Sequence, residues 1–205
     1  MSRAVLAAPT PLPRAFYARS TLVVARELIG KTLVREVAGV RLAARVVEVE
    51  AYIGERDRAC HARAGQTART AVMYGEPGHT YVYFTYGMHW MLNVVTERRG
   101  FPAAVLIRAL EPVAGIEAMR ARRGGVRDRD LLRGPARLCQ AFGIHRAANG
   151  ADLCDVSQGL WFESGAPVAR AAIARSARIG LGQTPEPWLS RPWRFALRDS
   201  PFVSR

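Results

Sequence analysis

The stretch Tyr-Val-Tyr-Phe-Thr-Tyr-Gly-Met-His-Trp, residues 81–90, carries the strongest local signal for structure in this chain. Its first five residues favour strands, Gly87 allows the backbone to reverse, and strand formers resume at Trp90. The stretch therefore predicts a β-hairpin with Tyr86 and Met88 at its tip. Large apolar groups at a turn either pack under a neighbouring loop or enter a partner as a wedge. Packing is the commoner outcome, and this stretch alone leaves both open.

The charge of the chain is strongly positive. Among its 205 residues, 30 Lys and Arg stand against 17 Asp and Glu, a net charge of +13. Lys31 is the only lysine, so the cations are nearly all arginines. Arginine binds phosphate through two parallel hydrogen bonds, which favours nucleic acid over an acidic membrane as the partner. An arginine-rich solvated surface gives the same total, so charge alone does not decide.

The cysteines and the apolar runs indicate the compartment. Cys60, Cys139 and Cys154 are too few and too scattered for a disulfide framework. No apolar run has the length of a membrane span, and the N-terminus lacks a clear signal segment. We expect a soluble cytoplasmic protein, and its chain is long enough to bury a stable core without disulfides or a structural metal.

Strands dominate the rest of the chain. A first helix is expected from Thr21 to Ile29, a second opened by Pro112, and a third between Gly134 and Gly143. The expected strands cover residues 32–34, 41–52, 103–110, 160–163, 173–179 and 193–197.

Two segments lack a periodic pattern. Residues 1–17 hold Pro9, Pro11 and Pro13 and are expected to be a flexible lead-in to a single domain over residues 18–205. Residues 54–78 form a long polar connection, and a connection of this length is usually functional or disordered.

One strand carries two carboxylates on the same face. Period-two alternation places Glu48, Glu50 and Tyr52 together, with the carboxylates about 7 Å apart along the strand. Neighbouring carboxylates can separate their pKa values, so that one is ionised and the other partly protonated. A solvated or arginine-paired face is the plainer alternative, and it is the better one without further context.

Other chemistries lack their motifs. His61 follows Cys60, but no histidine or cysteine pair has metal-ligand spacing, so no metal is expected. Phosphate-binding glycine loops and a nucleophile elbow are absent as well. The segment Gly134-Pro-Ala-Arg137 at a helix start predicts either a phosphate contact or an ordinary helix beginning, with equal weight.

Several motifs in order resemble one family, the alkyladenine (3-methyladenine, methylpurine) DNA glycosylases. Their match covers roughly residues 18–204, which makes it far more specific than any single motif. The motifs are Glu48-Val-Glu-Ala-Tyr52, His61, Tyr81-Val-Tyr-Phe-Thr-Tyr-Gly-Met88, Asn93, Leu106-Ile-Arg-Ala-Leu-Glu-Pro112, Gly134-Pro-Ala-Arg-Leu-Cys-Gln-Ala141, Arg178-Ile-Gly180 and Pro192-Trp-Arg-Phe195.

The resemblance implies base-excision repair. Members of the family flip alkylated or deaminated purines out of duplex DNA and hydrolyse the N-glycosidic bond, leaving an abasic site without cutting the strand. It implies an α+β, β-rich single domain with a curved, largely antiparallel sheet, a protruding hairpin and several short helices. It implies no cofactor, a double-stranded DNA partner, no membrane, and a monomer associated with the nucleoid.

Roles follow from motif positions in the same way. Glu50 matches the carboxylate that activates water, and Arg108 and the Val203 backbone match groups that hold that water. Matches to the base pocket are Tyr52, His61, Tyr83, Asn93 and Leu106.

Matches to the DNA contacts lie outside that pocket. Tyr86 and Met88 match the intercalating wedge, and Arg69, Gly134 and Arg137 match contacts to the DNA backbone. Within the pocket, the match at Asn93 implies crowding against the amino group of guanine.

This chain departs from the family pattern at a few positions. Thr67-Ala-Arg-Thr70 stands where Thr-Pro-Arg-Asn is common, which puts loop stiffness and DNA contacts in question. Trp90 and Met91 replace other residues near the pocket floor, and Asp199 replaces a common glycine near Val203.

Two rival functions remain beside the glycosylase. The first is a nucleic-acid-binding module without catalysis, against which Glu50 and Tyr52 on one strand argue. The second is a nucleoside hydrolase, which needs neither the charge of +13 nor an exposed wedge. Which lesion is preferred does not follow from the sequence.

Overall fold

The hairpin expected over residues 81–90 forms one edge of the sheet in the computed structural model, which describes residues 9–204. Strand β3 (Thr80–Thr85) pairs antiparallel with β4 (His89–Val95), and Thr85 lies opposite His89. Tyr86 and Gly87 make the turn with φ of 52° and 67°, a left-handed pair that suits hairpin reversals. The Tyr86 side chain is 79% exposed and Met88 is 67% exposed. The tip therefore projects into solvent, and packing under a neighbouring loop is excluded.

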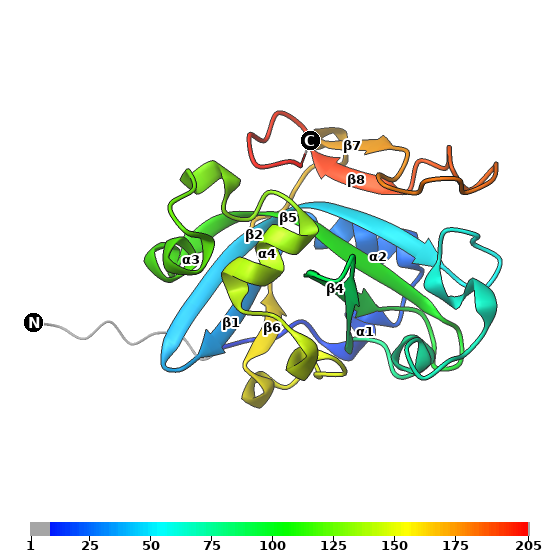
Figure 1. Ribbon diagram of the computed structural model, residues 1–205, viewed down its shortest axis with the longest axis horizontal. Coiled ribbons are helices and arrows are strands. Elements are labelled where there is room, and N and C mark those ends of the chain that lie inside the picture. The colour runs from blue at the N-terminus through cyan, green and yellow to red at the C-terminus, as the bar shows by residue number, and fades with distance from the viewer. Residues whose placement is uncertain (1–8, 205) are drawn as a thin grey trace, which may run out of the picture.

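In the part of the chain that the structure describes, eight strands form a single antiparallel sheet. Its order is β3-β4-β5-β2-β1-β6, with β8 paired to β2 and β7 to β8. Strand β1 pairs with the first half of β2, and β8 pairs with Glu48–Glu50 farther along it. The long strands β2 and β5 curve across the centre of the fold (Figure 1), which confirms the β-rich α+β class. The bounds not yet given are β1 (Thr32–Val37), β2 (Val40–Ile53), β5 (Ala103–Ala114), β6 (Leu160–Glu163), β7 (Ile173–Ser176) and β8 (Arg194–Leu197).

Four short α-helices accompany the sheet in the described part of the chain. They are α1 (Arg14–Tyr17), α2 (Thr21–Leu28), α3 (Ile116–Arg123) and α4 (Pro135–Phe142). The six 3₁₀ turns are η1 (His61–Ala64), η2 (Ala71–Tyr74), η3 (Asp128–Asp130), η4 (Arg146–Ala148), η5 (Val156–Gln158) and η6 (Arg170–Ala172). No helix between residues 9 and 204 is long and apolar enough to cross a bilayer.

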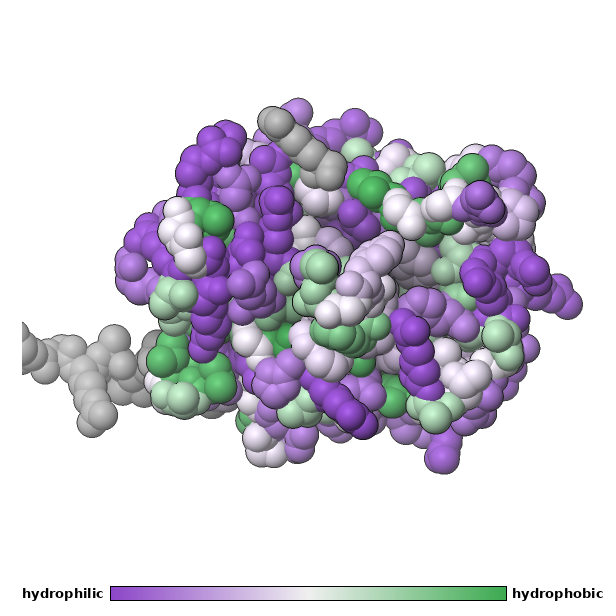
Figure 2. Space-filling model, viewed as in Figure 1, coloured by the Kyte–Doolittle hydropathy of each residue, from purple (hydrophilic) through white to green (hydrophobic). Residues whose placement is uncertain are grey.

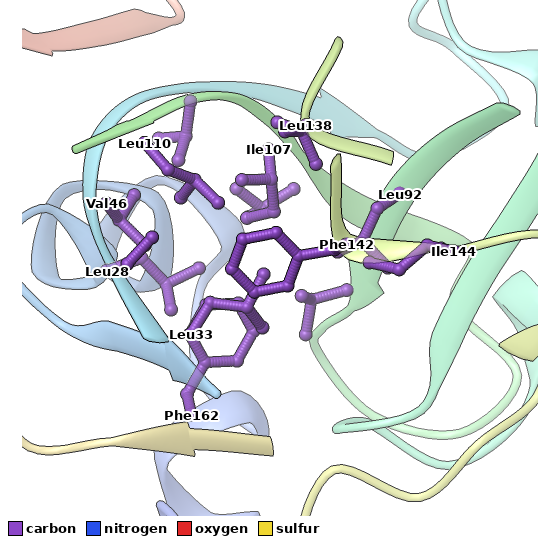
Figure 3. Close-up of a cluster of buried hydrophobic side chains, with 14 of the residues drawn as sticks. Leu28, Leu33, Val46, Leu92, Ile107, Leu110, Leu138, Phe142, Ile144 and Phe162 are labelled. Carbon is purple, nitrogen blue, oxygen red and sulfur yellow. The ribbon is translucent and has the colours of Figure 1, made fainter. Parts of the chain in front are cut away.

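One main core joins the sheet to α2 and α4. Figure 3 shows Phe142 of α4 pointing toward Phe162 and Leu33, with Leu28 of α2 and Val46 of β2 beside them. The expected helix signals hold for α4, because Pro135 occupies its first turn and Gly143 ends it with φ of 61°. Polar groups cover much of the face seen in Figure 2, in keeping with the arginine content.

The helix expected from Pro112 begins later than predicted. Pro112 lies in β5 opposite Ala44, and the ladder then shifts to pair Ala43 with Ala114. Proline is tolerated where a bulge interrupts the ladder, so pairing with β2 outweighs the local helix signal. The helix starts after Gly115, whose φ is 74° and where a Cβ would lie 2.6 Å from the Arg41 carbonyl oxygen.

The lead-in and the last expected strands also differ from the prediction. Residues 1–8 of the lead-in lie outside the described residues, but Tyr17 of α1 is completely buried and Leu12 is 5% exposed. The lead-in is therefore anchored at its C-terminal end by apolar burial. Strand β7 ends at Ser176 instead of reaching Ile179, because the following residues leave the ladder to contact β2.

Candidate active site

A cavity of about 530 Å³ opens between the hairpin, β5, the connection after β2 and the segment after β7. All five residues predicted for the base pocket line it: Tyr52, His61, Tyr83, Asn93 and Leu106. Arg108 and Tyr86, the residue predicted to act as a wedge, line it too, together with Pro135 and residues 179–181. The structure thus brings together side chains from five separate segments at one concave site of the size that small ligands occupy.

The long connection over residues 54–78 builds one wall of this cavity. It contains η1 and η2, and its residues Cys60, Ala62 and Met73 pack onto Tyr81 and onto Ala104 at the start of β5. This second apolar cluster supports the aromatic rings of Tyr52 and Tyr83. Of the two outcomes expected for a connection this long, disorder is thus excluded.

Both carboxylates of β2 are completely buried, so the solvated-face alternative is wrong. Glu48 and Glu50 have no exposed surface: β8 pairs with this part of β2, and Arg194, Ser204 and the Ile179 amide contact the two carboxylates. Opposite them the ladder passes from Glu48–Ala109 directly to Val49–Ile107, which leaves Arg108 as a bulged residue of β5. Such bulges re-aim a side chain, and the guanidinium of Arg108 lies on both carboxylates, with Nε 3.0 Å from Glu48 and Nη1 3.2 Å from Glu50.

Two hydrogen-bond donors and one ion-pair partner surround the Glu50 carboxylate. The Ile179 amide donates to Oε1 over 2.7 Å, the Tyr52 hydroxyl donates to Oε2 over 2.8 Å, and Arg108 Nη1 forms an ion pair with Oε1. Burial raises the pKa of Glu50, and these three partners oppose the rise while the charge of Glu48 adds to it. A carboxylate offers about four acceptor positions, so the two hydrogen bonds leave acceptor capacity on Glu50.

Glu48 ties the C-terminus to the sheet. It accepts hydrogen bonds from Arg108 Nε, from Arg194 Nε at 2.6 Å, and from the amide and hydroxyl of Ser204 at 2.6 and 2.9 Å. Sequence reasoning placed Glu48 beside Glu50 but did not separate their partners. Arg194 and Ser204 lie about 150 residues away in sequence, and no local pattern links them to Glu48.

The aromatic wall carries a neutral histidine. His61 Nδ1 lies 2.9 Å from the Tyr81 hydroxyl, and its ring meets Tyr83 edge-on at 4.5 Å between centroids. Burial, with the charges of Arg69 and Arg63, lowers the pKa of His61 to about 4. The guanidinium of Arg69 lies 5.0 Å from the centre of the Tyr83 ring. Arg69, predicted to contact the DNA backbone, thus lies against Tyr83 of the cavity wall but does not line the cavity itself.

Asn93 and Leu106 complete the inner wall. Asn93 is 4% exposed, and its side-chain amide donates to the Tyr81 carbonyl over 3.0 Å. Leu106 is 5% exposed and lies opposite Asn93 in the β4–β5 ladder. The two side chains are thus fixed by the hairpin's pairing with β5.

Six of the predicted residues are not part of the cavity lining: Glu50, Arg69, Met88, Gly134, Arg137 and Val203. Glu50 meets the cavity through Tyr52, Ile179 and Arg108, which contact its carboxylate and line the cavity. Met88 stands at the hairpin tip, and Gly134 and Arg137 lie at the start of α4, where Arg137 donates to the Arg133 carbonyl over 3.2 Å. The Val203 carbonyl accepts a hydrogen bond of 2.7 Å from Arg133. Val203 reaches the carboxylates only through its neighbour Ser204.

Two departures from the family pattern have a local explanation. Thr70 is 3% exposed and bonds to Thr67 and to the Gly65 carbonyl, which closes the turn where the family has proline and asparagine. Asp199 adopts a φ of 56°, a left-handed conformation that glycine and aspartate reach more readily than other residues.

The residues after β7 were missed as site residues. Ile179 donates to Glu50, and Arg178 forms a buried ion pair with Asp57. The motif Arg178-Ile-Gly180 marked the segment in the sequence but carried no role. No local sequence pattern pointed to Asp57, because its partner Arg178 is 121 residues away in the chain.

Comparison with known proteins supports the same assignment. The family model described as methylpurine-DNA glycosylase matches residues 15–201. A Methanocella arvoryzae protein named "Putative 3-methyladenine DNA glycosylase" is 53% identical over 95% of this chain and 96% of its own length. A Carboxydothermus hydrogenoformans protein of the same name is 48% identical over 95% of this chain and 98% of its own length. Because the family match covers residues 15–201 and these relatives match nearly end to end, this protein belongs to the methylpurine-DNA glycosylase family.

Proposed function

We propose that this protein flips alkylated or deaminated purines out of duplex DNA and hydrolyses their N-glycosidic bond with a water activated by Glu50. One observation carries the proposal. Glu50 is a fully buried carboxylate that accepts two hydrogen bonds and one ion pair and so keeps acceptor capacity, and its partners Tyr52, Ile179 and Arg108 themselves line the cavity.

Hydrolysis of the N-glycosidic bond requires a group that takes a proton from water and offsets the positive charge that develops on the sugar. A carboxylate does both, because its free oxygen lone pair accepts the proton and its charge stabilises an oxocarbenium-like transition state. Arg108 keeps Glu50 available as a base, because its charge opposes the rise in the Glu50 pKa caused by burial. In this scheme Arg108 and the backbone near Val203 help to orient the water.

The cavity walls suit a flipped purine. Tyr52, Tyr83 and His61 offer aromatic faces and edges for stacking, which contributes about 1–3 kcal/mol per base. Neutral His61 adds no charge repulsion against a cationic base. Asn93 and Leu106 lie deep in the wall, where close fit disfavours a purine with an extra amino group without excluding an alkylated one, whose glycosidic bond is already weak.

The hairpin tip suits the opening of the duplex. Tyr86 is rigid, aromatic and exposed at the rim of the cavity, and Met88 lies beside it. Apolar wedges of this kind enter the minor groove and take the space of an extruded nucleotide. Arg69, Gly134 and Arg137 then contact the backbone on either side.

A monofunctional reaction is part of the proposal. A Schiff-base mechanism needs an amine at the sugar, and the only lysine, Lys31, does not line the cavity. We therefore expect a single hydrolytic step that leaves an intact abasic strand, carried out by a monomer on chromosomal DNA.

The test is base release from duplex oligonucleotides that carry hypoxanthine, 1,N⁶-ethenoadenine or 7-methylguanine. Wild type should release the base, and Glu50→Gln should reduce the single-turnover rate at least about 100-fold, the lower range of general-base catalysis. Glu163→Gln, which changes a carboxylate of β6 outside the cavity lining, is the matched control. Release by Glu50→Gln at the wild-type rate refutes the role of Glu50, and equal cleavage of free nucleosides favours a nucleoside hydrolase instead.

A further inference from the structure

An ion pair between Asp57 and Arg178 lies wholly inside the protein behind the cavity. Both side chains are completely buried, and the two guanidinium nitrogens lie 2.6 and 2.9 Å from the two carboxylate oxygens. Asp57 also accepts hydrogen bonds from the amides of Ile53 and Ala59, at 3.2 and 3.0 Å. The carboxylate thereby anchors the start of the connection that carries His61.

Arg178 uses the same guanidinium to join three more parts of the fold. It donates to the carbonyl of Ala51 on β2 over 2.9 Å and to the carbonyl of Trp188 over 3.1 Å. Its guanidinium carbon lies 4.7 Å from the centre of the Tyr52 ring and 5.0 Å from that of Trp193. The guanidinium therefore backs one face of Tyr52, a residue of the cavity wall.

The backbone that follows Arg178 supplies a donor to the carboxylate at the centre of the site. The Ile179 amide belongs to the peptide unit that Arg178 begins, and it lies 2.7 Å from Glu50 Oε1. Four hydrogen bonds hold the Arg178 side chain on Asp57, Ala51 and Trp188. The position of this amide is thus set by the ion pair, since β7 has already ended at Ser176 and no ladder fixes the chain here.

We propose that the Asp57–Arg178 pair is a positioning device for the proposed glycosylase reaction: it holds the Ile179 amide on Glu50 and the Tyr52 ring against the cavity. The inference rests on the proposed role of Glu50. Neither residue touches the reacting atoms. They act through one amide, one phenol ring and the start of the His61 connection.

The pair influences the ionisation of Glu50 without facing it directly. The groups that face Glu50 come from three elements: Arg108 of β5, Glu48 and Tyr52 of β2, and the Ile179 amide after β7. Arg194 of β8 binds Glu48 and completes the set of charges. Two of these groups depend on the Asp57–Arg178 pair: the Ile179 amide for its position, and Tyr52 for the packing of its ring. Loosening the pair therefore weakens donors to the ionised carboxylate and makes Glu50 harder to ionise.

The experiment measures the pH dependence of single-turnover release of 7-methylguanine from duplex DNA. This base is already cationic and leaves without protonation, so the acidic limb of the profile reports the group that must be ionised. The variants are Arg178→Lys, which keeps the charge but loses the bidentate fork, and Asp57→Asn, which keeps the shape. Leu33→Ala, which leaves a cavity in the main core, is the control for a general loss of stability.

Both variants should move the acidic limb upward by about one pH unit, so that the rate on that limb falls about tenfold more than the rate on the plateau. Leu33→Ala should leave the midpoint in place. A midpoint unchanged in both variants, or moved equally by Leu33→Ala, overturns the proposal. If wild type releases no base, or if Glu50→Gln remains fully active, the proposed function itself fails instead.

A measurement on the wild-type protein covers the case in which the variants do not fold. The Ile179 amide proton should shift during the titration of Glu50, and this shift should vanish in Glu50→Gln. The Arg178 guanidinium protons should give separate, slowly exchanging NMR signals, as expected for a side chain held at both ends. Averaged Arg178 signals, or an Ile179 amide that does not respond to Glu50, contradict the proposal.

Discussion

Replacing Glu48 with glutamine tests how the buried charges of this site are balanced. Glu48 has no exposed surface, and its partners Arg108 and Arg194 have side chains that are 9% and 16% exposed. Glutamine keeps the shape but removes the charge, and its amide group brings donors to a position where four donors already meet. Two largely buried guanidinium groups and the Ser204 amide then compete for a single oxygen.

The expected loss of stability is large. Removing one partner of a buried ion pair costs about 3–5 kcal/mol, and each hydrogen bond to a charged group contributes about 1.5–3 kcal/mol. The partners overlap, so we take about 3–5 kcal/mol for the whole change. This is a substantial part of the 5–15 kcal/mol that separates typical folded and unfolded states.

Urea denaturation at pH 7 measures the effect, with an unchanged slope as the check that the same transition is compared. Glu36→Gln is the control, because Glu36 is 53% exposed and its contact with Arg41 spans 3.4 Å. An exposed pair of this kind contributes about 0–1 kcal/mol. A loss below about 1 kcal/mol in Glu48→Gln refutes the view that this carboxylate balances the two arginines.

Glu48→Gln should also shift the pH dependence of activity, in the direction opposite to Arg178→Lys. The charge of Glu48 is one cause of the raised Glu50 pKa, while Arg108 opposes the rise. Without Glu48 the Glu50 carboxyl loses a neighbouring negative charge and Arg108 is freed to interact with it, so its pKa falls. The acidic limb of base release moves to lower pH, whereas the Arg178→Lys change moves it to higher pH. Shifts of the same sign in both variants contradict the charge balance described for this site.

Further predictions concern the histidine, the wedge and the surface charge. His61 should titrate by NMR with a midpoint near 4. Because the pKa of His61 in the folded protein lies below its ordinary value, the contribution of His61 to stability is complete above pH 6.5 and is lost as the pH falls toward 4. Arg69→Gln should raise that midpoint, since the Arg69 charge is one of its causes; a midpoint at the ordinary value in wild type contradicts the burial. Tyr86→Ser should lower excision from duplex DNA about 5- to 150-fold more than excision from single strands, the equivalent of about 1–3 kcal/mol of stacking. The control Val113→Ser, which changes an exposed apolar residue of β5, should lower neither rate. Equal losses on both substrates in Tyr86→Ser argue against a wedge. DNA affinity should fall steeply with salt, with a log–log slope of about −0.9 for each phosphate contact, and a flat titration leaves the arginine excess as plain surface.

Local patterns were sufficient for the hairpin and for the general class of the fold. Strand formers around Gly87 predicted both the reversal and the tip, because a turn is decided by the residues within it. Alternation along β2 correctly placed Glu48, Glu50 and Tyr52 on one face, because neighbouring side chains on a strand point in opposite directions. The ordered motifs, spread over most of the chain, predicted the family that the comparisons then showed.

The surroundings of those residues were decided by tertiary structure. Alternation tells which side chains share a face and says nothing of what covers that face. The sequence therefore left a solvated or an arginine-paired face as the alternative, and only the structure brings the C-terminal segment and the residues after β7 onto the two carboxylates. Pro112 is a second case in which tertiary structure outweighed a local pattern, because pairing of β5 with β2 replaced the helix start that the sequence predicted.

What the sequence by itself determined is therefore most of the strands, the hairpin with Tyr86 at its tip, and the family, whereas the exposure of that tip was decided by the structure. Only the tertiary structure decided the environment of Glu50. The bulge at Arg108 depends on register with β2, and Arg178 meets Asp57 across 121 residues of chain. Such long-range pairs form where the curved sheet brings distant segments together, and no local propensity records which buried charge will meet which partner.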